Sequence, residues 1–247
     1  MIKVDGNDAK ERIVNAAIRL FSKKGYDATR VSDIAGAAKV NKALIYYYFT
    51  SKENILDFMI SHLLDNAVSL TVDFIQSNIV QMIQEGTLFI QPDRLHFESE
   101  EAVRRFMESA GRFCEKVVDY VLENREIIRI LMSESLKQGK HQNSLFRFMK
   151  FMGGDKTEPI VRTFSKLDGG FVYSDEIILF GFFYTVIPIV SFAAYCDDYR
   201  EVSGQTEERL RRAFLRVSQV VLASLVSGND ILLGDTFPFH PDQQNAV

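Results

Sequence analysis

The sequence predicts an all-α protein in which a three-helix amino-terminal unit is followed by a larger helical domain. Apolar residues recur at helical spacing along most of the 247 residues, and polar residues suited to capping precede many of these stretches. The 14 Gly and 5 Pro are too few for a collagen-like or low-complexity chain. With 47% hydrophobic and 25% charged residues, the chain has the composition of a globular protein.

Three short helices are expected within the first fifty residues. Residues 8–24 place apolar side chains on one face of a helix. Thr29 is expected to cap a second helix over 29–38, and Asn41 a third over 42–49. Two short helices that are joined by a tight turn and supported by a longer helix form the arrangement that places a recognition helix in the major groove of DNA.

A long helix should follow this unit. Thr50–Glu53 has the pattern of a capping box and opens a helix that runs to about Gln84. Residues 87–97 include Pro92 and are expected to form a loop or a short hairpin. Further helices are expected over 99–123, 125–137, 143–152, 156–167, 174–197 and 205–227.

These elements divide the chain into three parts. Residues 1–50 form the predicted helix-turn-helix domain, and residues 51–227 the helical domain for effector binding and dimerisation. Residues 228–247 form a carboxy-terminal tail, and composition does not decide whether this tail is ordered.

Charge is distributed unevenly along the chain. Residues 1–60 hold 10 Lys and Arg against 7 Asp and Glu, whereas the rest holds 19 against 26, for a total net charge of −4. A local basic part can contact phosphate even in an acidic protein. Cys114 and Cys196 lie far apart and spell out neither a disulfide framework nor a thiolate zinc site. Met1–Asp8 lacks the apolar run of a signal peptide, and a cytoplasmic location is expected.

One stretch has the length of a membrane span. Residues 177–196 contain no charged side chain. Acidic residues flank both ends, and no Lys or Arg cluster lies nearby to set an orientation. The preferred interpretation is a helix buried on one side in its own core and on the other in a partner subunit, with an integral membrane protein as the alternative.

The third short helix combines polar and aromatic side chains. Ile45 and Phe49 lie one turn apart and should face inward. Lysine and tyrosine side chains can donate to phosphate, tyrosine rings can lie against a sugar or a thymine methyl group, and a small residue allows close approach to bases. The candidates for these contacts are Lys42, Ala43, Tyr46, Tyr47, Tyr48 and, just beyond the helix, Lys52.

A wider set of residues at fixed spacings resembles the DNA-binding signature of the TetR family. The set comprises Gly25-Tyr26, Thr29, Asp33-Ile34-Ala35, Ala37-Ala38, Val40, Lys42, Tyr46, Tyr48-Phe49 and Ser51-Lys52-Glu53. The resemblance covers residues 8 to about 57 and implies that Thr29, Lys42, Ala43, Tyr46, Tyr47, Tyr48 and Lys52 lie at or near DNA. Two departures stand out. Lys39 occupies a turn position where the family usually has Gly, which costs strain in a left-handed backbone, and Leu44 replaces a small polar residue.

Aromatic residues are concentrated in the second domain. All 20 Phe except Phe21 and Phe49 lie after residue 50. Most belong to a core, yet ligand pockets are also apolar and often lie between helices. The resemblance implies that this domain binds a small effector and that its last two long helices pair with their copies in a dimer. The candidate effector-binding residues are Phe106, Phe113, Phe148, Phe183 and Tyr184.

The sequence gives little support for an enzymatic function. The 4 His are scattered, and no HExxH, GxSxG or phosphate-loop motif is present. The chain is therefore not expected to be an enzyme, and no metal or cofactor is expected.

The resulting hypothesis is a homodimeric transcriptional regulator that binds double-stranded operator DNA. It would act as a repressor and be released by a small, largely apolar effector. The alternative is a helical small-molecule-binding protein with a non-functional DNA-binding unit, which Lys39 and Leu44 would favour if they spoil docking on DNA.

Overall fold

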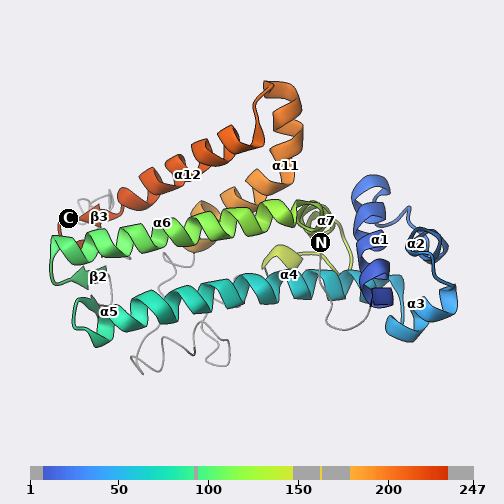
Figure 1. Ribbon diagram of the computed structural model, residues 1–247, viewed down its shortest axis with the longest axis horizontal. Coiled ribbons are helices and arrows are strands. Elements are labelled where there is room, and N and C mark those ends of the chain that lie inside the picture. The colour runs from blue at the N-terminus through green and yellow to red at the C-terminus, as the bar shows by residue number, and fades with distance from the viewer. Residues whose placement is uncertain (1–7, 92–93, 147–161, 163–178, 233–247) are drawn as a thin grey trace, which may run out of the picture. The chain divides into compact units, whose positions relative to one another are not determined.

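The computed structural model describes residues 8–91, 94–146, 162 and 179–232. Figure 1 traces its helices and strands in chain order. The chain divides into two compact units. Unit 1 comprises residues 1–69, 117–148 and 188–207, and unit 2 comprises residues 70–116, 149–187 and 208–247.

Unit 1 begins with the three predicted short helices. Helix α1 spans Asp8–Lys24, α2 spans Val31–Ala38 and α3 spans Lys42–Tyr48. The apolar side chains of all three meet in one core, in which Ile13, Val14, Ala17, Ile34 and Ile45 have no exposed surface. The predicted ranges of the first and third helices are confirmed to within one residue.

The predicted cap of the second helix is wrong. Arg30, not Thr29, is the capping residue of α2, and its backbone N–H donates to the Asp33 carboxylate over 3.2 Å. The Thr29 side chain is only 1% exposed, and its hydroxyl donates to the Gly25 carbonyl oxygen over 2.8 Å. Burying the methyl group and satisfying the hydroxyl at the end of α1 fixes the α1–α2 turn instead.

The long helix after α3 is confirmed. Helix α4 spans Lys52–Phe74, and helical structure continues through the π-helical segment η1, Ile75–Val80, and α5, Gln81–Gln84. The predicted capping box Thr50–Glu53 is displaced by one residue, because Ser51 is the cap: its side-chain oxygen accepts from the backbone N–H of Asn54 over 3.0 Å. Fully buried apolar residues hold the first turns of α4 in the core, namely Ile55, Leu56, Met59 and Ile60.

The rest of unit 1 is built from the end of α6, Glu100–Glu123, together with α7, Arg125–Leu136, and most of α11, Ile187–Ser203. The hydroxyl of Tyr120 on α6 donates to the Leu63 carbonyl of α4 over 2.8 Å. Arg125 begins α7 and pairs with Asp197 and Glu207 at 3.1 and 2.8 Å. These contacts connect α6 to α4 and α7 to α11.

Two of the predicted helices cannot be compared in full. From the predicted helix over 143–152, the described part contains only the short 3-10 helix η2, Ser144–Phe146. The predicted helix over 156–167 lies outside the described residues except for residue 162. The predicted helix over 174–197 corresponds, in its described part, to the π-helical segment η3, Phe180–Val186, followed by α11.

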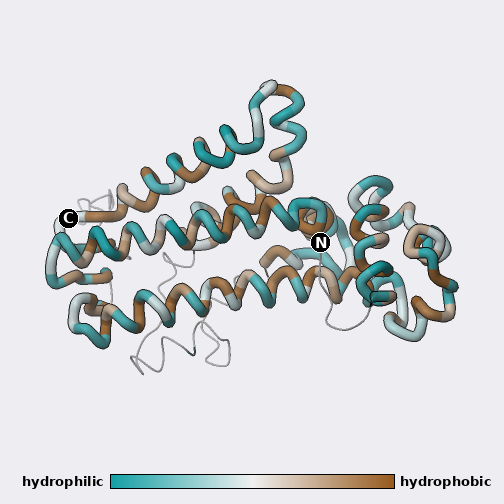
Figure 2. Tube along the Cα trace, viewed as in Figure 1, coloured by the Kyte–Doolittle hydropathy of each residue, from teal (hydrophilic) through white to brown (hydrophobic). Residues whose placement is uncertain are grey.

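Unit 2 contains most of α6 together with α12, Glu207–Ala223. Figure 2 shows apolar and polar residues alternating along α6. Its apolar side carries Phe106 and Phe113, whose ring centroids lie 6.5 and 4.5 Å from that of Phe74. Phe97 adds a fourth ring 5.3 Å from Phe106. Aromatic packing of this kind forms the core of unit 2.

A small antiparallel sheet completes unit 2, with strand order β1-β2-β4-β3. The predicted hairpin is confirmed as β1, Leu88–Ile90, and β2, Arg94–Phe97. The predicted helix over 205–227 is too long, because α12 ends at Ala223 and is followed by β3, Val226–Ser227, and β4, Asp230–Leu232. Strand β4 pairs with β2, which orders the first residues of the predicted tail.

Two described helical stretches are long and apolar enough to cross a membrane, Lys52–Gln84 and Phe180–Ser203. Core helices of soluble proteins often have the same length and composition. The first stretch has 39% of its apolar window buried inside the protein, and its residues Ile55, Leu56, Met59 and Ile60 are fully buried.

Candidate nucleic-acid interface

Helix α3 has one buried side and one exposed polar, aromatic side. Ile45 and Phe49 are buried at 0% and 2% exposure. Tyr46 and Tyr47 are 54% and 79% exposed. Lys42 and Ala43 are also exposed, whereas Tyr48 is half-buried. The helix therefore presents the side chains that the sequence analysis assigned to DNA, with Tyr47 as the most exposed ring.

Local contacts fix the position of α3. The side chain of Asn41 accepts from the backbone N–H of Leu44 over 2.7 Å, which confirms Asn41 as the cap. At the other end, the ring of Phe49 packs edge-on against Phe58 of α4, with centroids 5.6 Å apart. The ammonium of Lys10 on α1 lies 4.2 Å from the centroid of the Phe58 ring. A cation at this distance stabilises the junction of α1, α3 and α4.

The turn between α2 and α3 is left-handed at a lysine. Lys39 has φ 54° and ψ 47°, the conformation that favours glycine. The backbone N–H of Val40 closes the turn by donating to the Ala35 carbonyl over 3.0 Å. The structure thus confirms the strain expected at Lys39, while the turn still connects the two helices.

Lys52 makes contacts that the sequence did not predict. Its ammonium donates to the backbone carbonyls of Tyr26 and Thr29 over 2.8 and 3.0 Å, and it lies 3.5 Å from the carbonyl of Asp27. It also lies 4.1 Å from the centroid of the Tyr26 ring. An ammonium has three donors, and here they point at the α1–α2 turn. In this arrangement Lys52 holds the turn, and a phosphate contact by this side chain stays a prediction.

Of the seven predicted DNA-contacting residues, the structure brings Lys42, Ala43, Tyr46 and Tyr47 together on the exposed side of α3. It buries Thr29, whose side chain therefore offers no surface to DNA.

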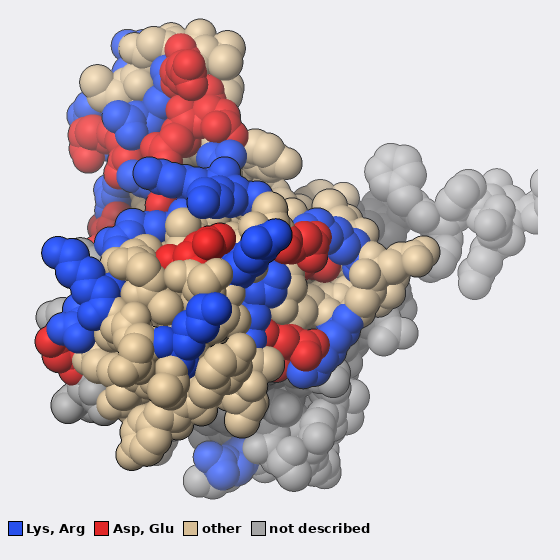
Figure 3. All heavy atoms as spheres, turned by 90° about the vertical axis from the view of Figure 1, so that its right-hand side faces the viewer, with Lys and Arg blue, Asp and Glu red and all other residues tan. Residues whose placement is uncertain are grey.

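Basic residues surround this surface. Figure 3 shows the molecule from the side of α1–α3, where Lys and Arg side chains lie among uncharged ones, with several Asp and Glu side chains between them. Exposed cations in this part of the sequence are Arg12, Arg19, Lys23, Lys24, Arg30, Lys39 and Lys42. Arg30 was not selected from the sequence, although a residue at the first turn of a helix is well placed to reach a phosphate.

The predicted effector-binding residues that the structure describes lie in two different surroundings. Phe106 and Phe113 pack against Phe74 in unit 2. Phe183 and Tyr184 are 53% and 62% exposed on η3, where they contact Phe182 and Phe180. Phe148 lies outside the described residues.

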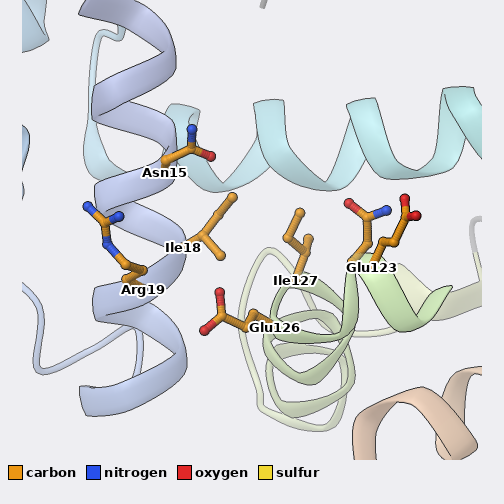
Figure 4. Close-up of a pocket in the computed structure, with 7 residues that line it drawn as sticks. Asn15, Ile18, Arg19, Glu123, Glu126 and Ile127 are labelled. Atoms are coloured by element: carbon orange, nitrogen blue, oxygen red, sulfur yellow. The ribbon is translucent and has the colours of Figure 1, made fainter. Parts of the chain in front are cut away.

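One hollow lies elsewhere, in unit 1. It has a volume of about 230 Å³ and lies between α1 and the junction of α6 and α7. Figure 4 shows Ile18 and Ile127 pointing toward each other across it. The remaining lining residues are Asn15, Arg19, Glu123, Asn124 and Glu126. The side-chain oxygen of Asn15 is buried and has no hydrogen-bond partner among the described residues.

Comparison with known proteins agrees with this geometry. Residues 13–58 match the family described as bacterial regulatory proteins, tetR family. The chain is 29% identical over 139 residues to a probable HTH-type transcriptional regulator, YttP, of Bacillus subtilis, covering 53% of this chain and 67% of YttP. It is 39% identical over 75 residues to IcaR of Staphylococcus aureus, a negative transcriptional regulator of the biofilm operon icaADBC, covering 30% of this chain and 36% of IcaR.

The fold is shared with solved structures. A transcriptional regulator of the TerR/AcrR family from Aquifex aeolicus superposes with a TM-score of 0.51 at 16% identity, covering 86% of this chain and 99% of the other. At this identity the likeness concerns the fold alone. The curated relatives are matched over part of their length, about two thirds of YttP and about a third of IcaR. These proteins are named as transcriptional regulators, and residues 13–58 of this chain are similar to the tetR family of bacterial regulatory proteins.

Proposed function

We propose that the chain is a transcriptional repressor that binds operator DNA as a homodimer and releases it when a small, largely apolar effector binds. The observation that carries the proposal is the exposure of Lys42, Tyr46 and Tyr47 on α3, directly over the buried Ile45 and Phe49. Because its apolar side stays packed in the core, the helix can place its exposed side in a major groove without losing that packing. Lysine then contacts phosphate, and the two rings contact sugars and bases.

The proposal that the protein represses transcription, rather than activating it, is based on one relative. IcaR is named as a negative regulator, and its 39% identity to this chain lies in a 75-residue segment. Because that segment is only 36% of IcaR, it supports DNA binding more strongly than repression. Repression is therefore part of the proposal.

Dimerisation is proposed from exposed apolar side chains on the last two helices. Helix α11 exposes Tyr195, Tyr199 and Val202 at helical spacing, and α12 exposes Val217 and Val220. Large exposed apolar side chains that share one face of a helix favour an interface, and a twofold pair uses the same surface on both copies. Two recognition helices must be about 34 Å apart to enter successive major grooves.

The proposed division of labour follows the sequence analysis. Residues 1–50 would bind DNA, residues 51–227 would bind the effector and dimerise, and residues 228–247 would form a tail. The aromatic packing around Phe106 and Phe113 supports an apolar effector, since a ligand that displaced one ring would meet apolar walls. A protein of this kind would act in the cytoplasm, where its DNA is.

A gel-shift assay with genomic fragments from around the protein's own coding region tests the proposal. We expect a shifted band that is lost at high salt and that competitor DNA of unrelated sequence does not remove. Native mass spectrometry of the freshly purified protein then identifies a co-purified small molecule and the dimer. Absence of a specific shift, together with a retained small molecule, would instead support a small-molecule-binding protein whose DNA-binding unit is non-functional.

A further inference from the structure

The segment that follows α7 is anchored to that helix at both ends. Helix α7 ends at Leu136, and the backbone of Lys137 is extended. After the turn at Gly139, the backbone N–H of Asn143 returns to the Ser135 carbonyl over 3.0 Å. The N–H of Leu145 donates to the Ser135 hydroxyl oxygen over 2.8 Å. A loop closed in this way moves with α7.

Two lysines of this loop reach the DNA-binding part of unit 1. The ammonium of Lys137 lies 3.0 Å from the carboxylate of Asp27, in the α1–α2 turn. Lys140 lies 3.0 Å from Asp57 and 3.5 Å from Glu53, both in the first turns of α4. The same loop therefore holds the turn that leads into α2 and the helix that follows α3.

A buried histidine lies between these two contacts. His141 is 9% exposed, and its ring centroid lies 6.2 Å from that of Tyr26. Its Nδ1 is 3.8 Å from the Asp57 carboxylate. Burial raises the pKa of Tyr26 to about 12, helped by the carboxylates that surround it, Glu53, Glu134, Asp27 and Asp57. The phenol is thus enclosed by groups from α4, from the α1–α2 turn and from the end of α7.

We propose that residues 137–141 form a latch that positions the α1–α2 turn and the start of α4 for DNA reading. The proposal rests on the proposed function. Isolated exposed ion pairs contribute little to stability. Their effect here is positional, because Lys137 and Lys140 join one rigid loop to the two segments that flank α2 and α3. Any displacement of the end of α7 is then transmitted to the recognition helix as a change in its orientation.

The chain offers a matched control for the test. Lys137→Asp breaks the contact with Asp27 and also the ion pair with the buried carboxylate of Glu134, and it reverses one charge. Arg129→Asp reverses one charge within α7, the helix that ends just before Lys137, and it breaks an exposed ion pair at 3.3 Å with Asp198 of α11 rather than with the DNA-binding part. Both variants change the net charge by the same amount, so any general electrostatic effect on DNA binding should be equal in the two.

We expect Lys137→Asp to weaken operator binding about fivefold more than Arg129→Asp does, the lower end of couplings usual in allosteric proteins. The swapped pair Asp27→Lys with Lys137→Asp restores the ion pair between positions 27 and 137 at unchanged net charge, though not the pair with Glu134, and should recover part of the affinity. A variant that had merely lost its fold would not be rescued in this way. The effects of the two single changes on operator affinity, added together, give the affinity expected without any interaction between them. If the double variant binds the operator no more tightly than this sum, the latch is disproved.

A second readout does not depend on DNA. The backbone N–H groups of Gly25 and Thr29 are hydrogen-bonded to the Phe21 and Tyr26 carbonyls, so their hydrogen exchange reports on the turn. In the free full-length protein, Lys137→Asp should speed exchange at these amides, and Arg129→Asp should not. Unchanged exchange in both variants would overturn the latch, whether or not the protein binds an operator. Failure of the wild-type protein to bind DNA would overturn the proposed function alone.

Discussion

The ammonium of Lys52 at the start of α4 lies 2.8 Å from the backbone carbonyl of Tyr26 and 4.1 Å from the centroid of its ring. Lys52→Met should therefore weaken operator binding by loosening the α1–α2 turn, without removing a phosphate contact. We expect the slope of log affinity against log salt to stay unchanged, whereas Lys42→Met should reduce it by about 1. A slope reduced by about 1 in Lys52→Met would show that the ammonium contacts phosphate after all.

The exposed ring of Tyr47 leads to a prediction about sequence preference. This side chain is 79% exposed and contributes little to the core, so Tyr47→Ala should leave the free energy of unfolding nearly unchanged. If the ring contacts bases, discrimination between operator variants should fall by about 1–3 kcal/mol at the affected position. Affinities for a panel of single-base operator variants measure this. A uniform loss across the panel would assign the ring to the DNA backbone.

The left-handed turn at Lys39 leads to a prediction about stability. Lys39→Gly should stabilise the protein by about 0.5–1 kcal/mol, because glycine adopts φ 54° without a steric cost and that gain exceeds its larger loss of backbone entropy. Urea unfolding of both proteins checks it. Lys23→Gly, inside α1, is the matched control and should destabilise by up to about 1 kcal/mol. Equal effects of the two changes would contradict the strain at Lys39.

The contact between β2 and β4 leads to a prediction about pH. The carboxylate of Asp230 lies 2.6 Å from Nδ1 of His96 and 3.4 Å from the Arg94 guanidinium. The hydrogen bond to His96, and then that to Arg94, hold the pKa of Asp230 below its ordinary value. Because the pKa is lower in the folded state, the ionised carboxylate stabilises the folded protein at pH values above its unfolded-state pKa of about 4. This stabilisation is lost as the pH falls through the folded-state pKa.

Asp230→Asn should accordingly be less stable than the wild type at neutral pH, and the difference should vanish in strong acid. Urea unfolding midpoints across this pH range measure the difference. Glu208→Gln removes an exposed carboxylate that pairs with Arg212 within α12, and should show no such pH dependence. If wild type and Asp230→Asn still differ in stability in strong acid, the ionised Asp230 carboxylate is not the cause of the difference.

Elements that depend on local chemistry could be predicted from the sequence. The cap at Asn41 acts on Leu44, three residues away, and the apolar spacing of α1 needs only its own residues. The exposed side of α3 follows from the same spacing once Ile45 is assigned to the core. Thr29 was misassigned because a threonine before a helix suits both a cap and a buried turn, and only the position of α1 decides between them.

Contacts between distant residues could not be predicted. Lys52 donates to backbone carbonyls 23 to 26 residues earlier in the chain. Every residue has a backbone carbonyl, so the sequence does not indicate which of them a lysine will contact. The pair Lys137–Asp27 joins residues 110 positions apart. Strand β4 is only three residues long, too short for an alternating pattern to separate it from the end of a helix.

Strand β4 also affects how the chain can be shortened. It covers one edge of β2, pairing Leu95 with Ile231, and so keeps a row of backbone groups away from other molecules. Ending the protein after residue 225 would uncover that edge and invite strand-to-strand association between copies. Truncations meant to improve solubility should therefore keep residues through Leu232.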